Sequence, residues 1–496
     1  MKTLTKILCL VISLLMVSGI FVSCIKKDTT EDTTASGVTD NTTTQTIAET
    51  VTPIGISSDV NFNNKDVNIL AWEDYTMQEF EAEAITGNEI NDAIYERNNT
   101  IEEKLGVNLI YTYTLGSSTN SANYISKVRI DAGASGAGEY DIFAAYSQIP
   151  ASLAMEGLLA DLRSTEYLDF SQAWWPAELV EETTINDKLY FCSGDISTNM
   201  LWMMTACFFN KDLIDSYNLE DPYDLIDNNQ WTLDKMMEMS AGKYVDNDNS
   251  GTKTSADTYG YMTYYMNIDA FFAASGLRSI EKNSDDELVV SSLYNGDKIT
   301  GLIDKLGGWF SSGGEAYQNT STSVRDVFFE QRSIFTMDRV FIVAGKDNSA
   351  DQDSIDFDFG ILPVPKYDSD QSRYYTNVGY PFTMYCISSA LADTDAASAA
   401  LEYLAYESAM LVTPAVFENA MKIKYASDEI SSAAYDLVRN SVTFELGRIF
   451  TVPLNNYASS QFRTSVISNS GTWSSNYQKI NSALNTYIAS IMDKFE

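Results

Sequence analysis

The densest group of oxygen donors in the sequence lies in one acidic stretch, residues 246–257. Carboxylates and hydroxyls recur there at alternate positions, and Gly251 stands at the sixth place. Calcium prefers hard oxygen ligands at this spacing, and the glycine permits the sharp turn that brings them together. We therefore predict a structural Ca²⁺ site and no organic cofactor. The predicted ligands are Asp246, Asp248, Ser250, Thr252 and Asp257.

Two departures separate this stretch from a calcium loop of the EF-hand type. Ser250 stands where Asp or Asn is usual, and Asp257 replaces the bidentate Glu that closes such loops. A helix is predicted before the stretch, but residues 259–261 after it have the composition of a strand. The alternative interpretation is a solvated acidic turn without a metal.

The sequence contains no histidine, which removes several kinds of catalytic site. Ser-His-Asp and Cys-His catalysis need an imidazole, and so do zinc sites built on histidine. Paired carboxylates, as in glycosidases, remain possible, but among 69 acidic residues two neighbours in sequence carry no information. We expect a binding protein and not an enzyme, with a carboxylate-based glycosidase as an alternative.

The overall charge limits the partners of the protein. The formal net charge is −37, with 69 acidic and 32 basic residues. Such a surface repels nucleic acid and anionic lipid and disfavours phosphorylated ligands, whereas neutral or cationic ligands are compatible.

Three cysteines lie in the main body, and each stands among apolar or aromatic residues. We predict that Cys192, Cys207 and Cys386 are buried free thiols, because a free cysteine behaves as a small apolar side chain. A disulfide between Cys192 and Cys207 is the alternative.

The first residues of the chain predict export and membrane anchoring. A short basic start precedes an apolar run, residues 7–20, which is shorter than the ~20 residues that a membrane helix needs. We therefore predict a signal peptide over residues 1–23. Cys24 follows Ser23 in a way that resembles a bacterial lipobox, so we expect its thiol to carry a lipid. A leftover core cysteine is the alternative.

A polar segment follows the predicted lipid site. Thr, Ser, Asp and Glu dominate residues 24–60, which contain too few apolar side chains to form a core. We predict that this segment is a disordered tether. A lipid at the end of a tether would hold a monomeric protein at the extracytoplasmic face of the cell membrane.

The main body begins with alternating strand and helix patterns. Strands are predicted at residues 66–72, 107–111 and 140–145, and helices at 89–104 and 124–132. This order predicts an α/β fold with a largely parallel sheet, in which ligands approach the carboxyl ends of the strands. Further helices are predicted at residues 396–406, 432–440 and 480–495.

Fragments along the body occur in an order typical of one family. A strand at residues 141–143 leads to a helix that ends Gly-Leu-Leu-Ala-Asp-Leu at 157–162. Over residues 66–408 the chain resembles the extracellular solute-binding proteins of ABC importers, the family 1 or maltose-binding-protein-like group of sugar-binding lipoproteins. The later matching fragments are residues 174–175, 187–190, 208–212, 231–235 and 357–367.

This resemblance implies a two-lobed clamshell, of the type II periplasmic-binding-protein kind, with a ligand cleft between the lobes and a helix-rich C-terminus. The chain of such proteins crosses between the lobes more than once, so each lobe is discontinuous in sequence. We predict residues 62–165 plus 325–375 for the first lobe, and 166–324 plus 376–496 for the second.

A sugar-binding cleft needs aromatic faces that stack on pyranose rings, and carboxylates or amides that bind vicinal hydroxyls. We expect these groups just after predicted strands or near the hinge. The ligand-binding candidates are Trp72, Glu73, Asp74, Tyr146, Asp195, Trp202 and Tyr380.

The resemblance implies a surface-anchored substrate-binding protein that captures a neutral small ligand and delivers it to ABC permease subunits. An oligosaccharide is the expected ligand, since the cleft chemistry above suits it. The same clamshell binding a peptide or polyamine, or acting as a sensor partner, stays as the alternative.

Overall fold

The computed structural model describes residues 54–496 apart from short gaps. All helices and strands of this part belong to one unit of the chain, Pro53–Glu496. The predicted signal peptide, Cys24 and most of the predicted tether lie outside the described residues. No helix within the described ranges is both long and apolar enough to cross a bilayer. The gaps are residues 134–137, 312–315, 345–354, 356, 427, 459 and 470–471.

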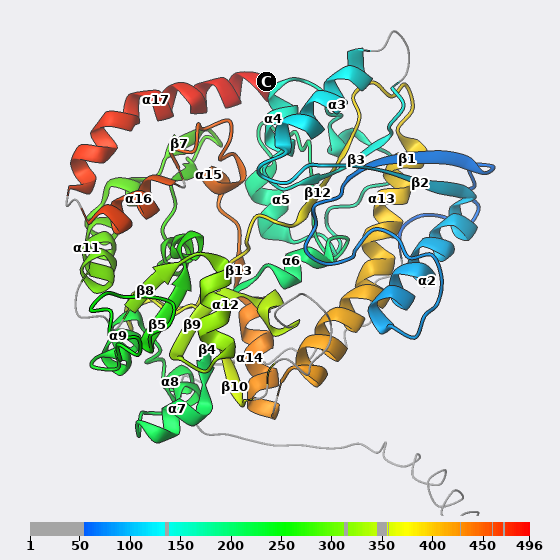
Figure 1. Ribbon diagram of the computed structural model, residues 1–496. Helices are drawn as coiled ribbons and strands as arrows, with labels where there is room; N and C mark the ends of the chain where they lie inside the picture. Colours follow the sequence, from blue (N-terminus) through cyan, green and yellow to red (C-terminus); the bar gives the residue numbers. More distant parts are fainter. Residues whose placement is uncertain are drawn as a thin grey trace, which may run out of the picture. The chain divides into compact units, whose positions relative to one another are not determined.

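The first sheet contains the three strands that the sequence predicted (Figure 1). β1 pairs in parallel with both β2 and β3, whereas β12 runs antiparallel to β3. The carboxyl ends of β1, β2 and β3 therefore meet at one edge of the sheet. In the order β12-β3-β1-β2, the strands are β12 (Thr383–Ile387), β3 (Ile142–Tyr146), β1 (Lys65–Trp72) and β2 (Val107–Thr114).

Helix α2 (Glu89–Leu105) joins β1 to β2, and local chemistry sets both of its ends. The side chain of Asn88 caps the amino end by accepting a hydrogen bond from the amide of Asn91 at 3.1 Å. Gly106 closes the carboxyl end with a φ of 60°, a left-handed conformation that glycine adopts without steric cost. The predicted helix at residues 89–104 is therefore confirmed.

The second sheet is mixed and has the order β10-β4-β9-β5-β8. β5 pairs in parallel with β8 and β9, and β4 runs antiparallel to β9 and β10. Its strands are β4 (Thr205–Asn210), β5 (Tyr259–Tyr264), β8 (Ala316–Asn319), β9 (Ser333–Arg339) and β10 (Phe359–Pro363).

The strand pairing corrects the predicted division into lobes. Residues 325–375 were assigned to the first lobe, but they carry β9 and β10, which pair with β4 in the second sheet. Residues 376–496 were assigned to the second lobe, but they contain β12, which pairs with β3 in the first sheet. Apolar patterns show that a segment is a strand without showing which distant strand it pairs with, so the crossing points were misplaced.

Three segments lie together where the chain passes between the sheets. Residues 378–382 lead from the second sheet to β12, and the amide of Gly379 donates to the carbonyl of Met203 at 2.7 Å, just before β4. Next to them, β11 (Thr376–Asn377) pairs in parallel with β13 (Val442–Thr443). The crossing region thus joins parts of the chain that are far apart in sequence.

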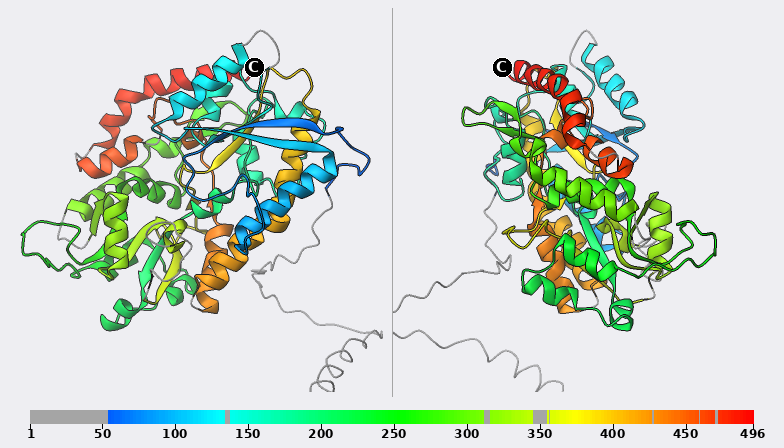
Figure 2. Two further views of the ribbon diagram at one scale, coloured as in Figure 1. Left: turned by 45° about the vertical axis from the view of Figure 1, so that its right-hand side comes forward. Right: turned by 90° about the vertical axis from the view of Figure 1, so that its left-hand side faces the viewer.

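The predicted C-terminal helices are present (Figures 1 and 2). Helix α13 (Asp395–Glu407) packs against α2, and α14 (Glu429–Asn440) packs against β10. Between them, residues 408–424 are largely π-helical. Helix α17 (Trp473–Lys494) contacts β7 (Leu288–Val290) and α11 (Asp297–Ser311).

The other elements connect these parts. β6 (Ile280–Lys282) forms a hairpin with β7. The remaining helices are α3 (Ser121–Gly133), α4 (Pro150–Met155), α5 (Ala177–Thr183), α6 (Thr198–Trp202), α7 (Lys211–Ser216), α8 (Pro222–Asp227), α9 (Leu233–Ser240), α10 (Asp269–Ala274), α12 (Ser321–Phe329), α15 (Leu446–Ile449) and α16 (Ser460–Ser468).

The three body cysteines are buried free thiols, as predicted. Cys192 and Cys386 lie in the first sheet region, where Cys192 forms an isolated bridge with Tyr385. Cys207 lies within β4. The alternative disulfide between Cys192 and Cys207 is therefore not formed.

Candidate ligand-binding site

The two tryptophan candidates are buried inside the protein. Trp72 is 0% exposed, and its indole Nε1 donates a hydrogen bond to Thr383 Oγ1 at 2.8 Å. Trp202 is 1% exposed and lies edge-on to the ring of Tyr425, with centroids 6.4 Å apart. Both rings hold the protein's own elements together, and Trp72 does so by joining β1 to β12.

Glu73 and Asp74 follow β1 at the edge of the first sheet. Glu73 is exposed, whereas the carboxylate of Asp74 accepts hydrogen bonds from the amides of Gly116 at 2.9 Å and Ser117 at 2.8 Å. Burial raises the pKa of Asp74, but these hydrogen bonds outweigh it and hold the pKa below its usual value. Asp74 therefore fixes the loop after β2.

Asp195 lines a cavity of about 270 Å³ beside the crossing segments. Its Oδ1 lies 3.6 Å from Nη2 of Arg439 and accepts a hydrogen bond from Thr413 Oγ1 at 2.8 Å. Burial raises the pKa of Asp195, against the lowering effect of Arg439 and Thr413. Met200, Leu201 and other apolar side chains form much of the remaining wall. The carboxylate of Asp195 already has its polar partners, Arg439 and Thr413, within the protein.

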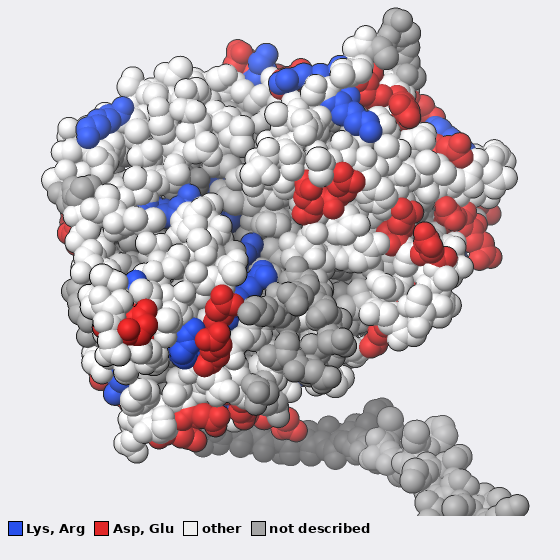
Figure 3. All heavy atoms as spheres, in the orientation of Figure 1, with Lys and Arg blue, Asp and Glu red and all other residues white. Residues whose placement is uncertain are grey.

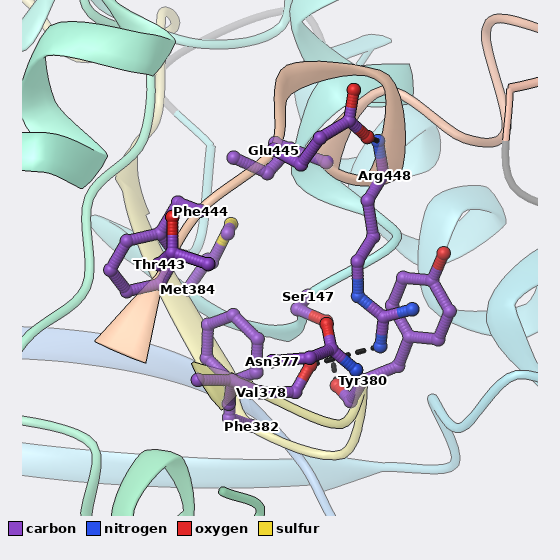
Figure 4. A pocket seen from close by; sticks show the side chains of 11 residues that line it. Ser147, Asn377, Val378, Tyr380, Phe382, Met384, Thr443, Phe444, Glu445 and Arg448 are labelled. Carbon is purple, nitrogen blue, oxygen red and sulfur yellow. Dashed lines mark hydrogen bonds between the residues drawn. The ribbon is translucent and has the colours of Figure 1, made fainter. Parts of the chain in front are cut away.

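A narrow pocket at the crossing region brings predicted and unpredicted residues together (Figure 4). Ser147 follows β3, and its Oγ donates a hydrogen bond to the carbonyl of Tyr380 at 2.6 Å. The predicted candidate Tyr380 lines this pocket, whereas Tyr146, directly before Ser147, is buried with 4% of its surface exposed. We call this site the central pocket, and its polar and aromatic walls include Ser147, Asn377, Tyr380, Phe444, Glu445 and Arg448.

Arg448 places a guanidinium group against the ring of Tyr380 (Figure 4). The distance from the guanidinium carbon to the ring centroid is 3.7 Å, and Nη2 donates to the carbonyl of Val378 at 2.9 Å. Helix α15 fixes the backbone position of Arg448. The backbone amide of Arg448 donates a hydrogen bond at 2.7 Å to the carboxylate of Glu445, which is the N-cap residue of this helix. The pocket therefore offers an aromatic ring and positioned hydrogen-bond donors.

The second sheet also contributes a guanidinium to this region. Arg339 ends β9 and lies against Gly379, where an added Cβ would be 2.8 Å from Arg339 Cδ. Burial raises the pKa of Tyr146, as does Tyr380, while Arg448 and Arg339 oppose the rise. The Tyr146 hydroxyl is thus within electrostatic reach of residues from both sheets. Figure 3 shows basic side chains in the hollow of one face of this acidic protein.

A buried acid lies on the far side of Arg448. Asp269 lines a neighbouring cavity that shares Asn377, Glu445 and Arg448 with the central pocket. Burial raises the pKa of Asp269 to about 6, although Arg463 and Arg448 lower it. Arg448 therefore interacts electrostatically with the buried carboxylate of Asp269 and also lines the central pocket.

Sequence reasoning missed Ser147, Arg339, Asn377 and Arg448. None of them stands in a motif, and Arg448 is 301 positions away from Ser147 in the chain. Glu445, three residues before Arg448, could have been recognised in the sequence as the N-cap of the short helix α15. A helix cap does not by itself indicate a pocket. Only the pairing of the crossing segments brings these side chains together.

The acidic stretch keeps three of its predicted calcium ligands together. Carboxylate oxygens of Asp246, Asp248 and Asp257 lie within 4.8 Å of one another. The amide of Gly251 donates to Asp246 at 2.9 Å, and its φ of 70° makes the predicted turn. Oxygen donors at this separation fit a divalent cation.

The two other predicted ligands are bonded to each other. Ser250 Oγ donates to the carbonyl of Thr252 at 2.9 Å. As predicted, the stretch is followed by strand β5, while the preceding helix α9 ends at Ser240. Calcium binding at the stretch stays a prediction.

Many solved structures share this fold at low sequence identity. An ABC substrate-binding protein from Listeria monocytogenes in complex with cycloalternan is 14% identical, with a TM-score of 0.52 over 86% of this chain and 99% of that chain. An ABC transporter solute-binding protein from Thermotoga lettingae, bound with α-D-tagatose, is 15% identical, with a TM-score of 0.53 over 86% and 100%. A family 1 extracellular solute-binding protein from Bifidobacterium longum subsp. infantis is 15% identical, with a TM-score of 0.50 over 87% and 99%.

These matches establish the fold. No protein-family model and no curated protein matches the chain. The structural likeness spans nearly the whole length of each of the three proteins, so the predicted α/β, two-lobed fold of solute-binding proteins is confirmed.

Proposed function

We propose that the protein is an extracytoplasmic solute-binding protein that captures a neutral oligosaccharide and delivers it to an ABC permease. The observation that carries the proposal is the likeness in fold, over 86% of this chain, to ABC solute-binding proteins seen with cycloalternan and with tagatose. The proposed activity is binding and release, without a chemical step.

The chemistry of the central pocket supports a sugar ligand. Tyr380 supplies a ring, and Ser147, Asn377 and Arg448 supply polar groups suited to hydroxyls. The cavity itself is about 20 Å³, which is room for a single water molecule. We therefore expect the two sheets to move apart when a sugar enters and to close around it, giving the permease a distinct bound form.

Isothermal titration against neutral oligosaccharides tests the proposal. We expect one class to bind and the Tyr380→Ala variant to lose about tenfold or more in affinity, or ~1.4 kcal/mol. Tyr95→Ala, which removes a half-buried ring from α2, is the matched control and should bind normally. Binding of peptides or polyamines, with no response to any oligosaccharide, would replace the ligand class.

We also propose that Cys24 carries the lipid that holds the protein at the membrane, since it follows a signal-like segment and precedes a polar tether. Metabolic labelling with an alkyne fatty acid should mark the wild type and not Cys24→Ser. Equal labelling of both proteins would exclude this residue as the anchor.

A further inference from the structure

A larger pocket lies at the edge of the first sheet, apart from the central pocket. The loop between β1 and α2, the start of α2 and the end of β2 enclose a cavity of about 640 Å³. We call it the sheet-edge pocket. Its polar and aromatic walls include Tyr75, Gln78, Glu81, Glu83, Asn91 and Tyr113.

Two tyrosine rings are held in place on this wall by a buried phenylalanine. Phe80 is 1% exposed, and its ring centroid lies 5.3 Å from that of Tyr75 and 6.1 Å from that of Tyr113. Tyr75 also lies edge-on to buried Trp72, with centroids 6.3 Å apart. Because both tyrosines are only half-buried, they present pre-positioned aromatic surface to the cavity.

A carboxylate is fixed beside these rings. The hydroxyl of Tyr113 donates a hydrogen bond to Oε1 of Glu81 at 2.8 Å, which leaves Oε2 facing no donor among the described residues. Glu83 is exposed on the same wall. Burial raises the pKa of Tyr75, and the charges of Glu79, Glu81 and Glu73 raise it further, which indicates a negative potential at this ring.

The negative charge of the pocket has no basic partner in the part of the chain that the structure describes. Among the described residues, no Lys or Arg lines the cavity or forms an ion pair with Glu81 or Glu83. Arg97 of α2 lies beneath Phe80 but is 1% exposed, and its Nη2 donates to the carbonyls of Glu79 at 3.0 Å and Phe80 at 2.7 Å. Its guanidinium therefore holds the loop and is not open to the cavity.

We propose that the sheet-edge pocket binds an organic ammonium group, which Tyr75 and Tyr113 contact through their ring faces and Glu81 through its carboxylate. Aromatic rings attract a cation through their quadrupole, and a nearby carboxylate adds a charge-assisted contact. An anion is repelled by Glu81 and Glu83, and an apolar ligand would bury them without a partner. This site lies outside the proposed sugar site, and it stands or falls independently of the sugar-binding function.

Titration of the full mature chain with choline, and with dimethylbutanol as its uncharged carbon isostere, tests the charge requirement. We expect choline to bind about tenfold or more tightly than the isostere, since only the charge differs. Equal binding of the two probes, or no heat with choline, overturns the proposal.

Variants locate the site and separate it from general attraction of cations to an acidic protein. Glu81→Gln and Tyr113→Leu should each weaken choline binding about tenfold, while Glu103→Gln, the same charge change on an exposed part of α2, should not. Far-UV circular dichroism shows that each variant is folded. If Glu103→Gln weakens choline binding as much as Glu81→Gln does, choline does not bind at the sheet-edge pocket and the proposal is wrong. The same conclusion follows if Arg448→Ala, in the central pocket, abolishes choline binding.

Discussion

The central pocket and the sheet-edge pocket differ in electrostatic character within one acidic protein. Arg448 and Glu445 both line the first, whereas Glu81 and Glu83 line the second without a basic neighbour on its described wall. A net charge of −37 therefore agrees with the sheet-edge pocket but does not describe the central pocket. Long-range charge governs which partners approach, and local placement governs what a pocket can hold.

The two pockets also differ in how the chain builds them. Ser147, Tyr380 and Arg448 of the central pocket come from three segments that meet only through the crossing region. The sheet-edge pocket needs one continuous segment, residues 75–91, and a single strand end at Tyr113. Changes in the crossing region should therefore disturb the first pocket more than the second.

The largest expected effect comes from Gly194, which lies where the chain leaves the bridge between Cys192 and β12 and leads towards β4. An added Cβ would be 2.1 Å from the carbonyl oxygen of Trp174 and 2.9 Å from Pro176 Cδ, so the backbone must shift. We expect Gly194→Ala to lower the free energy of unfolding by roughly 4 kcal/mol in urea denaturation. Gly308→Ala is the control, because an added Cβ there meets nothing within 4 Å in a helix. If Gly194→Ala has the wild-type free energy of unfolding, the backbone around Gly194 can shift at little energetic cost.

A pH dependence of similar size should arise from Glu402, which anchors the segment that Gly194 touches. Its carboxylate accepts hydrogen bonds from Trp174 Nε1 at 3.1 Å and Trp175 Nε1 at 3.0 Å. Burial raises the pKa of Glu402 to about 7, despite the lowering effect of the bonds from Trp175, Asp169 and Trp174.

A carboxyl whose folded pKa is raised stabilises the protein below its unfolded value of 4.5, and this contribution is lost as pH rises through about 7. We expect the free energy of unfolding to fall by about 3 kcal/mol over this range. Glu402→Gln should make the profile shallower by this amount, since Asp269, with a pKa raised to about 6, still titrates in the same range. Glu103→Gln should leave the profile unchanged. A wild-type profile that is already flat would contradict the raised pKa.

A smaller effect should separate the ligand chemistry of the two pockets. Arg448→Ala removes the guanidinium from the ring of Tyr380 and from the Val378 carbonyl. We expect oligosaccharide affinity to fall about thirtyfold, or ~2 kcal/mol, with choline binding unchanged. Arg129→Ala, which removes an exposed arginine paired with Glu156, is the control. A similar loss in the control would show that the effect is not specific to the pocket.

The smallest expected effect concerns the acidic stretch, which lies in neither pocket. Calcium should raise the melting temperature by a few degrees, corresponding to about 1 kcal/mol, and Asp257→Asn should abolish the shift. Magnesium serves as the control cation, since it demands a tighter octahedral geometry. No heat and no shift with calcium would leave the solvated acidic turn as the correct interpretation.

Local elements were predictable because neighbouring residues determine them. The three parallel strands, the caps of α2 at Asn88 and Gly106, and the buried thiols all follow from patterns within a few residues. The ligand-binding residues stay a prediction. Tyr380 lines the central pocket, whereas Trp72, Tyr146 and Trp202 are buried and Asp195 is paired with Arg439.

The sequence alone determined the α/β order, the helix ends, the exclusion of histidine chemistry and the acidic surface, because each depends on composition or short-range spacing. The tertiary structure decided which strands share a sheet, where the chain crosses, and that Arg448 lies on Tyr380. The physical reason is that strand pairing and side-chain packing join residues hundreds of positions apart. No local pattern in one chain records which distant partner each strand or side chain will meet.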